Sequence, residues 1–109
     1  MSNIDLAQII TAADKAAEAN ARHAAAVKQA CSDRILAVFS VNAQINLTAA
    51  RSAGLLDADD TARHKAGLAW IGSMRQACTT LAADPAADWQ SDAAWPYLPK
   101  GVAALAKQF

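Results

Sequence analysis

Three carboxylates and one imidazole in the stretch DADDTARHK form the chain's densest candidate for a metal or acid–base site. Asp57, Asp59 and Asp60 lie within four positions, and His64 follows Asp60 by four. Carboxylate oxygens and imidazole nitrogens bind metals, and the same groups act as general acids and bases. A metal site also needs a third ligand at comparable height and hydrogen bonds behind the ligands. The other histidine, His23, lies on a different predicted element.

The same residues also match the first turn of a helix. Asp57 follows a pair of leucines and precedes a helical pattern, which is the position of an N-cap. Asp59 and Asp60 then meet the unpaired N–H groups and the positive end of the helix dipole. His64 lies one turn further on and is spaced to hydrogen-bond Asp60. We therefore predict a helix start here, with no metal ligand and no catalytic residue.

The two cysteines, Cys31 and Cys78, lie far apart and show none of the spacings typical of zinc sites. In a reducing compartment such residues usually behave as small buried apolar side chains. A cysteine nucleophile needs a histidine within hydrogen-bonding distance, and His23 precedes Cys31 by about two helical turns. The sequence also lacks the GxGxxG, P-loop, GxSxG and HExxH motifs. We expect a protein that is not an enzyme and uses no cofactor.

Charge is balanced, with ten basic and ten acidic residues. The balance is also local, because residues 1–54 carry five basic and four acidic side chains, and residues 55–109 carry five and six. DNA-binding domains concentrate positive charge on one face, so we expect no nucleic-acid partner. Apolar runs fall short of the roughly 18 residues of a membrane span, and the first ten residues lack the features of a signal peptide. We expect no membrane contact and a cytoplasmic location, or a virion if a larger assembly carries the protein out.

Long helices are predicted for most of the chain. Alanine, the best helix former, makes up roughly a quarter of the residues, and no glycine or proline precedes Gly54. We predict one helix over residues 3–53, with a kink near Ser40–Asn42 compatible with the poorer helix formers there. Gly54 supplies the left-handed residue that ends it. A second helix is predicted over residues 58–83, ended by Pro85.

The rest of the chain changes character, because it holds all three prolines and two of the three tryptophans. We predict an irregular segment with a short turn at 85–90, then a last helix over residues 99–107, since proline suits a first helical position. The fold class is thus all-α, in one domain. Its parts are an N-terminal segment at 1–24, a helical hairpin at 25–84 and a C-terminal cap at 85–109.

The two long helices predict an antiparallel hairpin with a definite register. If the chain turns at Gly54–Leu56, residues at equal height have numbers that add to about 109. The matched pairs are Cys31 with Cys78, Ile35 with Met74, Val38 with Ile71, Phe39 with Trp70, and Asn42 with Gly67. Ile45 continues the same stripe. Packed helix axes lie about 8–10 Å apart, which is wider than the Cα separation of a disulfide, so we predict neighbouring reduced cysteines.

The second helix is too short to cover the first. It ends opposite residue 25, which leaves residues 1–24, about 36 Å of helix, without a partner in the hairpin. Either the C-terminal segment folds back along this overhang and buries its aromatic side chains there, or the overhang pairs with its copy in another chain.

Apolar and small residues along the overhang recur at steps of four and three, which favours pairing with a copy. Such steps are typical of a coiled-coil seam, and an asparagine within the seam can fix register and oligomer number. We predict a homo-oligomer whose interface includes Leu6, Ile10, Ala13, Ala17, Asn20, Ala24 and Val27.

Trp89, Trp95 and Tyr97 form the candidate surface for a different protein partner, because tryptophan and tyrosine are common interface anchors. The alternative is that they cover the open end of the hairpin as core residues. Arg34, with its basic neighbours along the first helix, is interpreted as part of a solvated face.

Residues 22–60 have the sequence RHAAAVKQACSDRILAVFSVNAQINLTAARSAGLLDADD. This basic, Ala-rich helix with RILAV and AQINL, closing in AGLL, resembles C-terminal regions of small bacteriophage or prophage tail-region proteins. GLAWIGSMRQAC and DWQSDAAWPYLPKGVAAL extend the resemblance over residues 22–107. It implies a non-enzymatic part in tail or tail-fibre assembly, with another phage tail protein as a partner, and it supplies no site residues. The alternative is a small cytoplasmic adaptor that binds a partner protein through its C-terminal aromatic residues.

Overall fold

The computed structural model describes the backbone of residues 2–109 and the side chains of residues 11–109. Helices and the loops between them make up all of this described part, so the predicted all-α class is confirmed. The elements are α1 (Ser2–Val38), α2 (Val41–Ser52), α3 (Ala58–Ala83), a 3-10 helix η1 (Asp92–Ala94) and α4 (Val102–Lys107).

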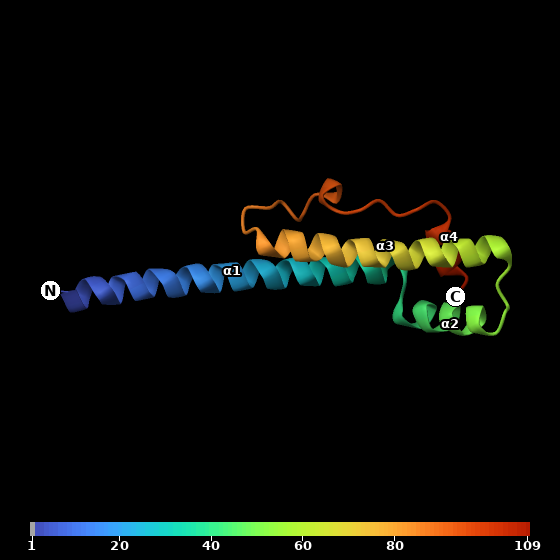
Figure 1. The fold of residues 1–109 in the computed structure, drawn as a ribbon, viewed down its shortest axis with the longest axis horizontal. Helices are drawn as coiled ribbons and strands as arrows, with labels where there is room; N and C mark the ends of the chain where they lie inside the picture. Colours follow the sequence, from blue (N-terminus) through green and yellow to red (C-terminus); the bar gives the residue numbers. More distant parts are fainter. Residues whose placement is uncertain (1) are drawn as a thin grey trace.

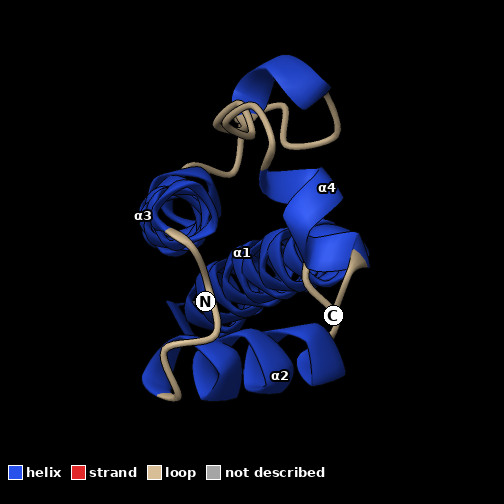
Figure 2. Ribbon diagram, turned by 90° about the vertical axis from the view of Figure 1, so that its right-hand side faces the viewer, coloured by secondary structure: helices blue, strands red, loops and turns tan. Residues whose placement is uncertain are grey.

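The molecule is elongated because α1 extends far beyond the other helices. Its extents are 74 × 25 × 16 Å and its radius of gyration is 20.1 Å, against about 13 Å for a compact domain of similar length. In Figure 1, α1 and α3 lie side by side and run in opposite directions, which is the predicted hairpin. Figure 2 shows α2, α3 and α4 arranged around the axis of α1 at the opposite end from the N-terminus.

The start and end of α3 follow the predicted local rules. The Asp57 carboxylate accepts a hydrogen bond from the N–H of Asp60 at 2.7 Å, so the N-cap is confirmed. The helix ends at Ala83, and Asp84 is extended before Pro85. Ahead of α3, Gly54 has a φ of 72° and terminates the preceding helix, as predicted.

The predicted single helix over residues 3–53 is wrong, because the chain breaks between α1 and α2. Ser40 leaves the helical region, with a ψ of 160°, and its hydroxyl accepts a hydrogen bond from the N–H of Ala43 at 3.0 Å. The side chain of Gln44 donates to the carbonyl of Phe39 at 3.1 Å. Serine is favoured at N-caps, and these two bonds replace the helical bonds that the break removes.

Phe39 marks the point where the predicted register ends. Its ring is buried and lies 6.4 Å from that of Trp70, centroid to centroid, so this pair is confirmed. The pairing of Asn42 with Gly67 is wrong, because Asn42 is exposed and Phe39 itself packs against Gly67. Ile45, placed on the same stripe, is 60% exposed. Once α2 turns away at Ser40, its residues no longer face α3 as a continuous helix would.

The core of this end of the molecule is completed by α2 and α4. Leu47 of α2 and Val102 and Leu105 of α4 are almost fully buried. The last helix begins later than predicted, because Gly101 takes a left-handed conformation with a φ of 86° immediately before Val102. Burial of α4 between α2 and α3 depends on this turn.

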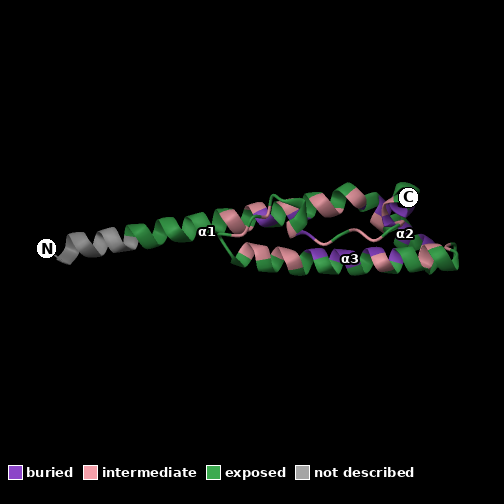
Figure 3. Ribbon diagram, turned by 90° about the horizontal axis from the view of Figure 1, so that it is seen from above, coloured by how far each residue is buried: buried purple, intermediate pink, exposed green. Residues whose placement is uncertain are grey.

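The C-terminal segment, residues 84–101, does not cover the overhang. It leaves the end of α3 and runs back toward α4 alongside the hairpin (Figure 1). Of the two alternatives for the overhang, the one in which the C-terminal segment folds back along the N-terminal part of α1 is therefore wrong. Residues 11–22 of α1 are all exposed, and Figure 3 shows this stretch in green beyond the end of α3.

Two glycines of α3 provide a matched test of the packing. A Cβ at Gly67 would lie 2.6 Å from Cζ of Phe39 and 3.1 Å from a methyl group of Val102, whereas a Cβ at Gly72 would meet nothing within 4 Å. Phe39 cannot move easily, because it is 2% exposed and held by Trp70. We expect Gly67→Ala to lower the free energy of unfolding by about 1–3 kcal/mol through overpacking. We expect Gly72→Ala to raise it by about 0.5–1 kcal/mol through helix propensity.

Urea denaturation followed by circular dichroism measures both changes. Equal stabilisation by the two alanines would show that Phe39 does not pack against Gly67.

Candidate interaction surfaces

The carboxylates around Asp57 serve the start of α3, and they do not form a cluster with His64. The predicted hydrogen bond between Asp60 and His64 is wrong. Arg63 instead donates to the Asp60 carboxylate at 2.8 Å, on the surface of α3. The His64 side chain is instead buried, with only 4% of its surface exposed.

His64 is a buried titratable group whose burial was not predicted from the sequence. It borders a cavity of about 70 Å³ together with Phe39, Leu47 and Leu68, and its Nδ1 has no hydrogen-bond partner among the described residues. Burial lowers the pKa of the imidazole below its usual 6.5, and the nearby Arg51 lowers it further. His64 therefore belongs to the contact between α2 and α3 and is held there in its neutral form.

The aromatic residues predicted to bind a partner lie in different environments. Trp95 is 5% exposed, and its indole N–H donates to the carbonyl of Trp89 at 2.8 Å. Trp89 is half-buried. Only Tyr97 projects into solvent, with 91% of its surface exposed. Two of the three residues thus cover the hairpin, and the third remains available to a partner.

Arg34 holds the C-terminal segment on the hairpin, and its interpretation as a solvated residue is wrong. Its guanidinium lies 3.0 Å from the carboxylate of Asp92 and 5.3 Å from the ring centroid of Trp95. The indole N–H of Trp70 adds a hydrogen bond to the carbonyl of Pro96 at 3.2 Å. Acidic and aromatic residues in a Pro-rich segment are a signal for such an anchor, but the sequence does not show which arginine they meet.

A cavity of about 410 Å³ lies beneath the C-terminal segment. Its walls include Val38 of α1, Met74 of α3, and Trp95 and Tyr97 of the C-terminal segment. Tyr97 therefore stands at the edge of a hollow with an apolar lining, which is a common setting for an interface anchor.

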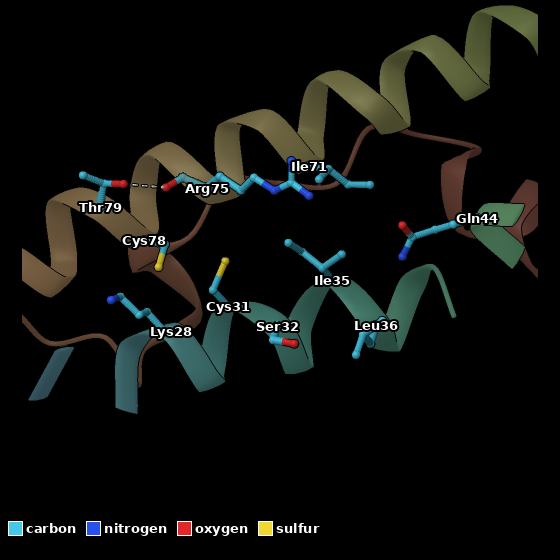
Figure 4. Close-up of a pocket in the computed structure, with 10 residues that line it drawn as sticks. All are labelled: Lys28, Cys31, Ser32, Ile35, Leu36, Gln44, Ile71, Arg75, Cys78 and Thr79. Atoms are coloured by element: carbon cyan, nitrogen blue, oxygen red, sulfur yellow. Dashed lines mark hydrogen bonds between the residues drawn. The ribbon is translucent and has the colours of Figure 1, made fainter. Parts of the chain in front are cut away.

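On another face of the hairpin, α1 and α3 form a groove of about 470 Å³ that contains both cysteines. Figure 4 shows the two sulfur atoms pointing toward each other, that of Cys31 from α1 and that of Cys78 from α3. Both cysteines are free, as the register predicts. Burial raises the pKa of the Cys31 thiol, and the neighbouring Cys78 raises it further. The thiol stays protonated and donates to the carbonyl of Met74 at 3.6 Å.

The groove is positively charged. Lys28 and Arg75 line it from α1 and α3, and no acidic residue lies among its lining residues (Figure 4). Neither cation forms an ion pair with another described residue. The apolar part of the lining includes Ile35, Leu36 and Ile71. Such a surface suits an occupant that combines acidic and apolar side chains.

The predicted oligomer seam passes from solvent into the core of the single chain. Ala13, Ala17 and Asn20 are exposed, Ala24 is half-buried, and Val27 is completely buried. The side chains of Leu6 and Ile10 lie outside the described residues. The His23 ring contacts the carbonyl of Leu81 at 2.8 Å, in the last turn of α3. From His23 onward, α3 therefore occupies the face that the seam would present to a copy.

Comparisons of the chain with protein-family models, with curated proteins and with solved structures find no match. Within the described part of the chain, no group of three or more histidine, cysteine, aspartate or glutamate side chains is placed to hold a metal ion. None of the described helices is long and apolar enough to cross a membrane.

The burial of His64 predicts a pH-dependent stability. Its pKa is lower in the folded than in the unfolded chain, so unfolding takes up a proton once the pH falls below about 6.5. The contribution of His64 is therefore fully present above pH 6.5 and is lost as the pH falls toward the folded-state pKa. We expect the free energy of unfolding to decrease on acidification from about pH 7.5 to about pH 5.5, by at most about 1.4 kcal/mol per pH unit for this group.

Urea denaturation at each pH checks this dependence, with His64→Met as the comparison. The variant removes the titrating group, so its stability should change less over the same range, and the difference between the two proteins isolates His64. Parallel pH profiles would mean that His64 titrates normally in the folded chain.

Proposed function

We propose that this chain is a non-enzymatic structural or assembly protein that self-associates through the N-terminal part of α1. One observation supports self-association above all. Every residue from 11 to 22 is exposed, over about 18 Å of helix, and the C-terminal segment runs in the other direction. No other part of the described chain buries this stretch of α1.

A helical stretch of this length that buries no face is marginal in water, because helices in proteins are stabilised mainly by packing of one face. In the hairpin that packing ends near His23, where α3 ends. Ala-rich helices approach one another closely, since their side chains are short. Association with another helix would supply the packing that the N-terminal part of α1 lacks in the single chain.

The setting we propose is assembly of a bacteriophage or prophage tail, with another tail protein as a further partner. This proposal is supported by the resemblance of residues 22–107 to phage tail-region proteins. It places the protein in the cytoplasm of the host or in the virion.

A second candidate function is that of an adaptor that binds a partner protein through the C-terminal segment. The observation that favours it is the exposure of Tyr97, 91%, at the edge of the cavity of about 410 Å³. Trp89 and Trp95 would then support the surface from below.

The absolute mass in solution tests self-association. We expect light scattering after gel filtration to give an oligomer for the full chain and a monomer for a chain that lacks residues 1–22. The truncated chain should remain helical by circular dichroism, because none of residues 11–22 contributes to the described core.

Tyr97→Ala is the matched control, since it changes an exposed residue outside α1 and should leave the oligomer intact. A full-length chain that is monomeric at all accessible concentrations would contradict self-association and leave the adaptor as the better proposal.

A further inference from the structure

We propose that the self-association is an antiparallel dimer, in which the N-terminal part of α1 from one copy lies in the groove between α1 and α3 of the other. This arrangement depends on the proposed self-association and specifies its face and its orientation. It differs from a parallel coiled coil along the predicted seam, which would join equivalent residues of the two copies.

A parallel pairing along the seam conflicts with the hairpin. Val27 is fully buried in the single chain and Cys31 is 5% exposed, and both lie on the face that packs against α3. His23 contacts the end of α3 at Leu81. A copy that ran parallel to α1 on this face would meet the end of α3 at residue 23, so the pairing would be limited to the overhang.

A different face of α1 is free along the overhang and the hairpin alike. It comprises residues spaced by four and three, which share one side of a helix. All of them are exposed in the single chain: Asp14, Glu18, Ala21, Ala25, Lys28 and Ser32. Leu36, one turn further on, is 42% exposed although it is a large apolar residue. This face therefore continues from the overhang directly into the groove, which Lys28, Ser32 and Leu36 line.

The residues of this face are arranged symmetrically about His23, as a two-fold axis requires. A C2 interface uses the same surface on both copies, so residues at equal distances from the axis meet. Centred on residue 23, this rule brings Ala21 to Ala25 of the partner and Glu18 to Lys28. The alanines at the crossing allow the two helix axes to come close.

Charge complementarity favours this occupant for the groove. Glu18 would meet the unpaired cation Lys28, and Asp14 would lie at the height of Ser32, near Arg75 on the opposite wall. Among the described residues, Glu18 forms an ion pair with Arg22 at 4.0 Å, and both side chains are at least 70% exposed, so this pair is weak and easily exchanged. By symmetry each contact occurs twice in the dimer.

Disulfide cross-linking of the full chain distinguishes the two orientations. In a Cys31→Ala/Cys78→Ala background, we expect Glu18→Cys/Lys28→Cys to form covalent dimers in a glutathione redox buffer, as seen by non-reducing electrophoresis and mass spectrometry. An internal bond is excluded, because ten residues of one helix span about 15 Å and a disulfide needs Cα atoms about 5.5–6 Å apart. A single cysteine at 18 or at 28 should not link to the same cysteine of the partner copy. Each lies five residues from the axis at residue 23, so the two copies are about 15 Å apart along the helices. Ala17→Cys in the same background tests the parallel arrangement, because a parallel coiled coil along the predicted seam would bring the two copies of residue 17 together and link them.

The outcomes separate the two proposals. Covalent dimers from the double variant alone support the antiparallel dimer. An oligomer that cross-links through Ala17→Cys, or through none of these cysteines, overturns the antiparallel arrangement and leaves self-association standing. A full chain that is monomeric by light scattering overturns both.

Charge exchange provides a second test in the chain with its native cysteines, so it does not depend on the core substitutions. We expect Glu18→Lys to weaken dimerisation about tenfold, because two symmetry-related attractions become repulsions. Adding Lys28→Glu should restore the wild-type dissociation constant, measured by sedimentation equilibrium. Lys15→Glu, at an exposed position on another side of α1, is the control and should have no comparable effect. Absence of rescue by the second substitution would overturn the pairing of Glu18 with Lys28.

Discussion

The close contact of Phe39 with Gly67 determines how the two ends of this molecule differ. Because the ring occupies the space that a Cβ would fill, α1 and α3 approach closely at this height. The chain then leaves the helix at Ser40, and α2 turns away from the line of α1. Val102 of α4 packs against the same glycine, in the space beside the break. A continuous helix through residue 40 would direct the next two turns along α3 and leave less room for α4.

The C-terminal segment depends on the hairpin for its direction. It contains little regular structure, and its path is set by Arg34 and Trp70, which bind Asp92 and Pro96. The Arg34 guanidinium also lies over the ring of Trp95, which adds a cation–π contact. Since both anchors lie on the hairpin, the segment covers the hairpin and cannot also reach the N-terminal part of α1. The exposure of residues 11–22 is therefore a consequence of where Arg34 and Trp70 lie.

The helix ends that depend on neighbouring residues were predicted correctly from the sequence. The bounds of α3, its Asp57 cap and the left-handed Gly54 follow from helix-end chemistry. Equal spacing from the turn also placed Cys31 near Cys78. At Ser40 the local pattern predicted a kink, whereas the serine cap and the bond from Gln44 to Phe39 make a full break. The position of α4 beside this break comes from a distant part of the sequence, which local spacing does not reveal. The predicted hydrogen bond between His64 and Asp60 was wrong for a related reason. Their spacing allows the bond, but His64 is buried beside Leu47 of α2, and the spacing does not show that contact.

The length of α3 relative to α1 explains why one two-fold axis can serve the whole dimer. The hairpin ends where His23 meets Leu81, so residue 23 separates the part of α1 that α3 covers from the part that it leaves exposed. With the axis at residue 23, residues 11–22 of each copy lie opposite residues 24–35 of the other, which is the part of α1 that α3 accompanies. An axis at residue 23 places each overhang beside the hairpin of the other copy. The groove with Lys28 and Arg75 then receives the acidic face of Asp14 and Glu18, and the same geometry that exposes α1 in one chain provides its binding surface in the next.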